Sequence, residues 1–139
     1  MGQAQERCKY PRSETGEASQ NSVHFAIDLE RRTVIARFGE RLTVADIQKY
    51  VQDLCTHPAF DPSFSEIADI SEVKDLPLEV FDFMQLADHT DPFSAESKRA
   101  FVVRTSVQEH AARMHKILRN RGKFKIFQTL EEAENWISS

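Results

Sequence analysis

The chain has 139 residues, of which 40% are hydrophobic and 29% charged, and its 18 basic and 22 acidic side chains give a net charge of −4. This length and composition indicate one globular domain and exclude a disordered chain. The apolar runs are far shorter than the ~18 residues of a membrane span, and only Gly39 and Gly122 follow residue 22, which argues against glycine-rich phosphate loops.

Residues 1–22 contain few apolar side chains and lack the basic and then apolar pattern of a signal peptide. We therefore predict a flexible N-terminal tail over 1–22 and a single folded domain over 23–139. The two cysteines, Cys8 in this tail and Cys55 on an apolar helix stripe, are too few for a disulfide scaffold. They favour a reducing compartment, and we expect a cytoplasmic protein in which Cys55 packs in the core.

Two segments of alternating apolar and polar residues open the domain. Residues 23–29 have apolar side chains at every second position, and the strand pattern resumes over 33–38 after the polar Glu30-Arg31-Arg32. Two strands joined by so short a connection must run antiparallel. The start of the domain is therefore predicted to be a hairpin.

After the hairpin, predicted helices and strands alternate. A helix begins at Thr43, which forms a capping-box pattern with Asp46, and it ends before Pro58. Residues 64–70 are predicted to form a strand. Residues 77–88 are predicted to form the next helix, because proline suits a first helical turn.

The unbroken apolar run at 100–103 predicts a central strand that is covered on both faces. The following helix is expected to begin at a capping box of Ser106 and Glu109 and to end at Gly122 in the left-handed conformation. Its buried stripe is predicted to consist of Val107, Ala111, Met114 and Leu118.

A lysine-flanked segment at 124–126 predicts an edge strand, and a capping box of Thr129 and Glu132 begins the last helix. The predicted order is β-β-α-β-α-β-α-β-α. Because the last three strands each follow a helix, right-handed crossovers make them parallel. The fold class is therefore α/β: a single-domain, five-stranded mixed sheet with an N-terminal antiparallel hairpin and parallel βαβ crossovers, packed with four helices.

Three stretches carry a resemblance to a known family: the first strand ending in Ala26-Ile27-Asp28, the third strand and turn from Glu66 to Val73, and the C-terminal stretch from Phe124 to Ile137 with its Glu-Ala-x-x-Trp ending. Together with the order of elements, they resemble the STAS domain of bacterial anti-sigma-factor antagonists. The chain is more similar still to the small bacterial SpoIIAA-like proteins, also termed STAS/SEC14-like. The resemblance covers nearly all of residues 23–138 and implies this α/β fold.

The chain departs from that family at its switch. In antagonists controlled by phosphorylation, an Asp-Ser-Ser-Gly turn presents the phosphorylated serine at a helix N-terminus. The residues here are Pro77, Leu78, Glu79 and Val80. The resemblance therefore implies the scaffold of an interaction or regulatory module without the phosphorylatable serine.

In open sheets with parallel strands, ligands bind beyond the carboxyl ends of the strands. Here these ends carry Asp69, Ser71, Arg104, Thr105 and Ser106. Arg104 and the hydroxyls at the head of the helix could hold an anionic metabolite or, as the SEC14 part of the resemblance suggests, a lipid. The alternative is that the hydroxyls only cap the helix and that Arg104 is solvated.

The predicted helix over 77–88 offers a second candidate site. Most of its apolar residues face the sheet, but Leu78 and Leu86 fall among acidic residues on the outer side. With Phe93, these leucines could contact a protein partner or a second copy of the chain. Isolated exposed leucines are common, however, so this surface has a purely incidental explanation as well.

Charge is segregated along the sequence. Between residues 53 and 96 every Asp, Glu, Lys or Arg except Lys74 is acidic, whereas between residues 110 and 130 all are basic. Such segregation fits attraction to a charged partner or head-to-tail self-association, or simply solvated faces. It does not predict nucleic-acid binding, because the chain is acidic overall and its basic residues are not interleaved with exposed aromatics.

No pattern predicts an enzyme or a metal site. His110 and His115 are too far apart around a helix to hold one metal ion, and there is no Gly-x-Ser-x-Gly motif. We therefore expect no catalytic residue, metal or cofactor. The leading hypothesis is a non-catalytic protein-interaction or regulatory module, and the alternative is a small-ligand-binding protein that holds a lipid or an anionic metabolite at the strand ends.

Overall fold

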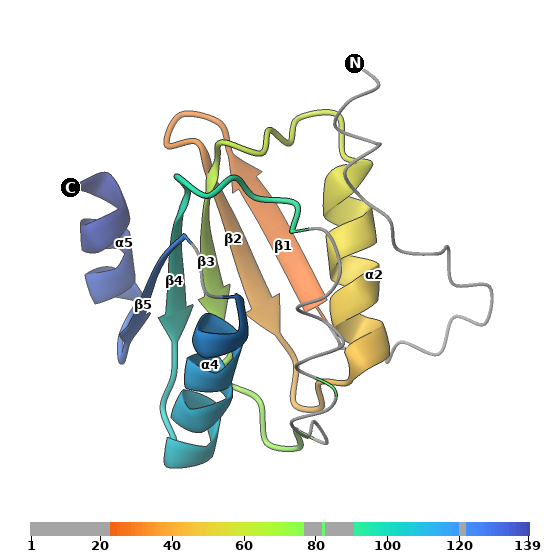
Figure 1. Cartoon of the computed structure of the whole chain (residues 1–139), viewed down its shortest axis with the longest axis vertical. Helices are drawn as coiled ribbons and strands as arrows, with labels where there is room; N and C mark the ends of the chain where they lie inside the picture. The colour runs from red at the N-terminus through yellow and green to blue at the C-terminus, as the bar shows by residue number, and fades with distance from the viewer. Residues whose placement is uncertain (1–22, 77–81, 83–90, 120–121) are drawn as a thin grey trace.

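The computed structural model describes residues 23–76, 82, 91–119 and 122–139 of the chain. Within them, five strands form one sheet and three helices pack against it (Figure 1). The predicted tail over 1–22 lies outside the described residues, as does the predicted helix over 77–88 apart from Asp82. The described part of the chain therefore supports three helices, where the sequence predicts four.

The strands lie side by side in the order in which they occur along the chain. They are β1 (Val23–Asp28), β2 (Thr33–Phe38), β3 (Ser65–Asp69), β4 (Lys98–Val102) and β5 (Lys123–Phe127). β1 pairs with β2 antiparallel, and every other neighbouring pair is parallel. The predicted five-stranded mixed sheet, with its N-terminal hairpin and its edge strand at β5, is confirmed.

The helices are α2 (Val44–Cys55), α4 (Ser106–Arg119) and α5 (Leu130–Ser138). In the predicted capping box of α2, Asp46 N donates to Thr43 Oγ1 at 3.2 Å and Thr43 N donates to Asp46 Oδ2 at 3.0 Å. Thr129 caps α5 by accepting a hydrogen bond from Glu132 N at 3.1 Å. These caps satisfy amides that a helix N-terminus leaves open, so both helices begin where the sequence predicts.

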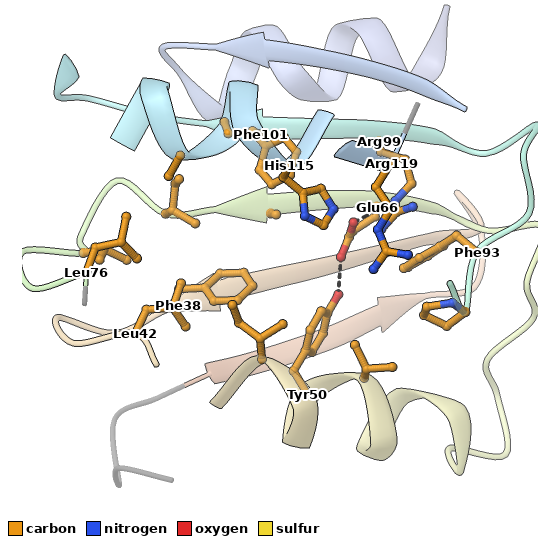
Figure 2. A pocket seen from close by; sticks show the side chains of 18 residues that line it. Phe38, Leu42, Tyr50, Glu66, Leu76, Phe93, Arg99, Phe101, His115 and Arg119 are labelled. Carbon is orange, nitrogen blue, oxygen red and sulfur yellow. Dashed lines mark hydrogen bonds and ion pairs between the residues drawn. The ribbon is translucent and has the colours of Figure 1, made fainter. Parts of the chain in front are cut away.

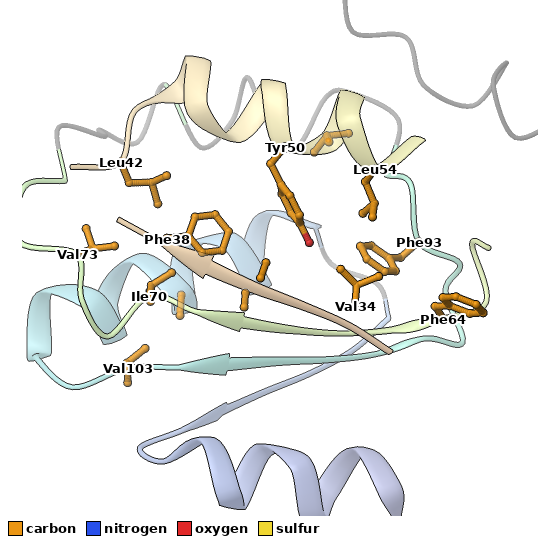
Figure 3. Close-up of a cluster of buried hydrophobic side chains, with 14 of the residues drawn as sticks. Val34, Phe38, Leu42, Tyr50, Leu54, Phe64, Ile70, Val73, Phe93 and Val103 are labelled. Atoms are coloured by element: carbon orange, nitrogen blue, oxygen red, sulfur yellow. The ribbon is translucent and has the colours of Figure 1, made fainter. Parts of the chain in front are cut away.

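The helices cover both faces of the sheet. The larger cluster of buried residues joins one face of the sheet to Tyr50 and Leu54 of α2 and to Ala112 of α4. α5 lies across the sheet from α2, as Figure 3 shows, and buries Ala133 in a smaller cluster with Ile67. The face under α2 and α4 is the one that contains the candidate site.

Two residues depart from the sequence prediction. Leu29, predicted inside the first strand, lies in the turn after β1 and is 63% exposed, because β1 already ends at Asp28. Cys55 is buried in the core as predicted, but it is disulfide-bonded, whereas the sequence predicts a reduced thiol. The reduced Cys55 expected for a reducing compartment is therefore not observed.

Candidate functional site

The residues predicted to bind a ligand follow the carboxyl ends of β3 and β4, and three of them share one groove. Ser71, Arg104 and Thr105 line this groove, whereas Asp69 and Ser106 do not. The charged side chains in the rest of the lining are of both signs, and they are Glu40, Glu72 and Lys74. The groove therefore has no consistent charge that would favour an anion.

Several backbone amides near this end of the sheet are already bonded within the protein. Arg104 N and Thr105 N donate to Gln108 Oε1 at 2.7 and 3.1 Å, and Gln108 N donates to Thr105 Oγ1 at 3.2 Å. The carboxylate of Asp69 accepts hydrogen bonds from Ser71 N and Ser71 Oγ at 3.0 and 2.6 Å. Because these groups satisfy one another, the amides of Ser71, Arg104 and Thr105 are not open to an anion at the predicted site.

The same contacts correct the predicted start of α4. The capping box is formed by Thr105 and Gln108, one residue earlier than the predicted pair of Ser106 and Glu109. Glu109 instead forms an exposed ion pair with Arg113 one turn further along α4. The helix is consequently rotated about its axis relative to the prediction.

This rotation places polar residues of α4 inside the protein. Gln108 is 2% exposed and donates to the carbonyl oxygens of Ser71 and Val73 at 3.2 and 2.7 Å, which fixes the helix to the loop after β3. Val107, predicted on the buried stripe, is 65% exposed, and so is Ile117. Ala111 is buried as predicted, with Ala112 beside it.

A cavity of about 90 Å³ lies between the sheet, α2 and α4 (Figure 2). Its walls are mainly apolar and include Phe38, Leu42, Ile70, Val73, Phe93 and Phe101. Its polar side chains come from α2, β3, β4 and α4, and they are Tyr50, Glu66, Arg99, His115 and Arg119. Apolar walls with a few convergent polar groups resemble the lining of small-molecule sites, and the volume limits an occupant to a few non-hydrogen atoms.

The acidic and basic side chains near this cavity form a buried network. Arg99 Nε donates to Glu66 Oε1 at 2.9 Å, and Arg99 Nη1 donates to Asp91 Oδ2 at 2.7 Å. Tyr50 Oη donates to Glu66 Oε2 at 2.6 Å, a contact that Figure 2 shows reaching from α2 to the sheet. The side chains of Arg99, Glu66 and Asp91 are at most 7% exposed, so the network is shielded from solvent.

The network keeps its charges through mutual attraction. Burial opposes ionisation of Asp91, but the positive charges of Arg99 and Arg119 hold the pKa of this carboxyl below its ordinary value. Burial likewise opposes the charge of Arg99, but Glu66 and Asp91 raise its pKa. Burial and the adjacent carboxylate of Glu66 raise the pKa of Tyr50 well above its ordinary value, so its hydroxyl remains a donor.

His115 differs from the network because its ring has only aromatic contacts. The ring lies edge-on to Phe101 and Phe124, with centroid distances of 5.5 and 5.7 Å. Burial, with smaller effects of Arg119 and Arg99, lowers the pKa of His115 to about 3. In the described part of the chain no hydrogen bond joins its nitrogens to another group. At neutral pH it is therefore an uncharged ring with one donor and one acceptor at the cavity wall.

The predicted leucine interface is not visible in the described residues. Leu78 and Leu86 lie outside them. Phe93, predicted as a third surface member, is 1% exposed and belongs to the core. Its ring contacts Phe60 at a centroid distance of 5.3 Å, and the guanidinium of Arg99 lies 4.4 Å from its centre. Phe93 is therefore a structural residue rather than a contact for a partner.

Sequence reasoning missed the polar residues of the cavity. Glu66 lies within the strand predicted over 64–70, and Arg99 directly precedes the apolar run at 100–103. A charged residue in or next to a buried strand indicates that a partner of opposite charge is buried with it. That signal was present in the sequence, but it does not say which residues pair. His115 gave no signal, because the predicted stripe placed it away from the core.

Among the described residues no group of three or more His, Cys, Asp or Glu side chains is arranged to hold a metal ion. None of the helices in this part of the chain combines the length and apolarity needed to cross a bilayer.

No family profile matches the chain, and no curated protein matches it either. Among solved structures it is similar to an uncharacterized protein of the DUF3478 family from Shewanella loihica, whose crystal structure has a SpoIIAA-like fold. The two chains are 20% identical, with a TM-score of 0.58 over 87% of this chain and 98% of the other. The similarity extends to the fold, and this chain has a SpoIIAA-like α/β fold.

Proposed function

We propose that this protein is a non-catalytic binding protein whose ligand, a small and mainly apolar molecule, occupies the cavity between the sheet, α2 and α4. The orientation of α4 carries this proposal. Val107 and Ile117 are each 65% exposed, while His115 and Arg119 of the same helix line the cavity. If burial of apolar side chains alone set the orientation of α4, Val107 and Ile117 would face the sheet and the two polar side chains would face solvent. Departures of this kind from simple packing rules concentrate at functional sites.

The proposed site differs from the alternative that the sequence predicts. The strand-end groove has mixed charge, and the amides of Arg104 and Thr105 beside it are bonded to Gln108. The cavity instead offers apolar walls that water solvates poorly, so an apolar ligand gains free energy by entering it.

Thermal unfolding in the presence of small uncharged apolar probes such as xenon and benzene tests the proposal. Because a ligand that binds only the folded state stabilises it, the midpoint of unfolding should rise with ligand concentration. Ala112→Leu adds a larger side chain at the cavity wall and should abolish this rise. Ala133→Leu is the matched control, since Ala133 is equally buried but belongs to the cluster under α5. A rise that persists in Ala112→Leu, or no rise in the wild-type protein, contradicts the cavity as the binding site.

The exposed side chains of α4 favour a second candidate function, a module that binds a protein partner or a second copy of the chain. Val107 and Ile117 lie on the helix face that turns away from the sheet. If they form a self-association surface, Ile117→Asp should shift the sedimentation profile toward a smaller species. Leu29→Asp provides the control, because Leu29 is 63% exposed in a distant turn. An unchanged profile for Ile117→Asp contradicts this candidate.

A cytoplasmic location stays a prediction. The disulfide at Cys55 is unusual for a reducing compartment, and fractionation of the native cells would test the location directly.

A further inference from the structure

The two edges of the sheet, which Figure 1 shows on opposite sides of the molecule, differ in how they are protected. β5 carries lysine at two of its five positions, Lys123 and Lys125, and both side chains are exposed. β1 contains neither lysine nor proline, its register against β2 runs without a bulge, and no strand among the described residues pairs with its outer side. Open strand edges pair readily with other chains, and lysine is a common protection against such pairing. β1 therefore has the properties of an edge that accepts another strand.

The backbone geometry shows which residues of β1 present hydrogen-bonding groups at this outer edge. Arg32 O accepts from Ser65 N of β3 at 2.9 Å, so the N–H on the other side of the same peptide bond points toward β1. That N–H belongs to the residue opposite Asp28, and hydrogen-bonded pairs alternate along an antiparallel ladder. Phe25 and Ile27 therefore direct their N–H and C=O groups away from β2, toward the outer edge.

We infer that β1 pairs antiparallel with β1 of a second copy of this chain, around a twofold axis at Ala26. In this register Phe25 of each copy exchanges backbone hydrogen bonds with Ile27 of the other. The two sheets join into one, and the symmetry uses up the β1 edge of both copies, so the assembly closes at a dimer. This inference goes beyond the proposed function, because it concerns a surface remote from the cavity.

Polar side chains match across the axis on one face of β1. His24 lies opposite Asp28 of the second copy, and the same contact recurs on the other side of the axis. The Asp28 carboxylate accepts from Arg31 N at 3.2 Å within its own chain, and it can accept a further bond from an imidazole N–H. Arg37 lies beside His24 on β2 and is exposed, so it adds positive charge close to that carboxylate.

Apolar side chains match on the other face. Val23 of one copy lies next to Leu29 of the other, and Leu29 is 63% exposed in the single chain. Opposite charges and apolar side chains that face each other across strands both stabilise a pairing. A register shifted by two residues loses both matches, so the twofold axis falls at Ala26.

Cysteine cross-linking tests this register. Ala26 is exposed and faces its own copy in a pair without backbone hydrogen bonds, where the Cα atoms are about 4.5 Å apart and a disulfide can form. We expect Ala26→Cys to give a covalent dimer under mild oxidation. His24→Cys is the matched control, because it is exposed on the same face but lies about 13 Å from its copy. Cross-linking of both variants alike, or of neither, overturns the inference.

Sedimentation of the full chain over about a hundredfold range of concentration measures the dimer without a cross-link. Ala26→Lys gives β1 the protection that β5 has, because two lysines then face each other, and it should raise the dissociation constant about tenfold or more. Ala95→Lys, at an exposed position before β4, should leave the constant unchanged. A monomer at every concentration, or a dimer that Ala26→Lys leaves intact, overturns the inference. If Ala26→Lys does not fold, the two cysteine variants decide the matter.

Two further variants separate this dimer from self-association through α4. If β1 forms the contact, Leu29→Asp should weaken the dimer and Ile117→Asp should not. If the exposed face of α4 forms the contact, the two variants should give the reverse result, which overturns the inference. Binding of apolar probes in the cavity is measured separately by thermal unfolding, so either proposal can fail without the other.

Discussion

Arg99 joins two buried carboxylates, and its guanidinium also lies over two aromatic rings. It donates to Glu66 and Asp91, and its central carbon is 4.4 Å from the centre of the Phe93 ring and 5.0 Å from that of Phe124. A buried ion pair adds little net stability, but removal of one partner leaves an uncompensated charge. The role of Arg99 is therefore best revealed by removing it.

We predict that Arg99→Met lowers the free energy of unfolding by about 3–5 kcal/mol, because both carboxylates remain buried without a cation. Urea unfolding at pH 7 measures the change. Arg113→Met is the matched control: the side chain of Arg113 is 63% exposed in its pair with Glu109, and its loss should cost about 0–1 kcal/mol. Similar costs for the two variants would contradict the assignment of a shielded network.

His115 should make stability depend on pH. Its pKa is about 3 in the folded protein, against an ordinary value of about 6.5 in the unfolded chain. Between these values the unfolded chain binds a proton that the folded protein excludes, so stability falls as the pH is lowered from about 6.5 toward 3. Within the described residues, the charged and titratable groups around the ring are Arg99, Arg119, Asp91, Glu66 and Tyr50.

We predict that His115→Gln flattens this dependence by up to about 1.4 kcal/mol per pH unit, the slope for one proton. The measurement is the free energy of unfolding in urea at pH 7, 6 and 5 for both proteins. His110→Gln, at an exposed position of α4, is the control for loss of a histidine. Parallel curves for the wild type and His115→Gln would show that the ring is protonated equally in the folded and unfolded states.

At the scale of elements, Gln108 connects α4 to the loop after β3. Its side-chain oxygen accepts from two backbone amides at the start of the helix, and its nitrogen donates to the carbonyls of Ser71 and Val73. All of these atoms lie in a part-buried or buried setting, where an unmade hydrogen bond is costly. One side chain thus determines both where α4 begins and which face it presents.

We predict that Gln108→Ala lowers the free energy of unfolding by about 1–3 kcal/mol, because it leaves buried amides and carbonyls without partners. Thr105→Ala, which removes only the hydroxyl cap, should cost about 1 kcal/mol. Urea unfolding compares them. Gln108→Glu should fall between the two variants, since a carboxylate can accept from the amides but cannot donate to the carbonyls. A cost for Gln108→Ala no greater than that for Thr105→Ala would contradict the bridging role.

The same element shows what the sequence can and cannot predict. The capping box of α2 was predictable because Thr43 and Asp46 are local partners, and the strands were predictable from alternation. The rotation of α4 was not, because Ser106 with Glu109 resembles a capping box as closely as Thr105 with Gln108 does. The choice depends on carbonyls after β3 that are distant in sequence. The pairing of Glu66 with Arg99 also depends on residues that are distant in sequence, since the register of β3 against β4 places the two residues side by side.

At the scale of the whole molecule, the sheet separates two apolar layers. Ala112 of α4 belongs to the larger cluster on the face of α2, and Ala133 of α5 belongs to the smaller cluster on the other face. The cavity of about 90 Å³ and its polar network lie on the first face. The proposed binding site therefore belongs to the layer under α2 and α4, and the layer under α5 lies on the opposite face of the sheet.

This separation predicts that changes in the two layers act independently. Ala112→Leu and Ala133→Leu each overpack a buried position and should cost about 1–3 kcal/mol, with the lower value for Ala112→Leu because its side chain can extend into the cavity. Since the two sites share no packing partners, the double variant should cost the sum of the single costs to within about 0.5 kcal/mol. Urea unfolding of the four proteins measures the sum. A coupling well above that limit would mean that the sheet transmits strain between its faces, and ligand binding in the cavity would then also alter the layer under α5.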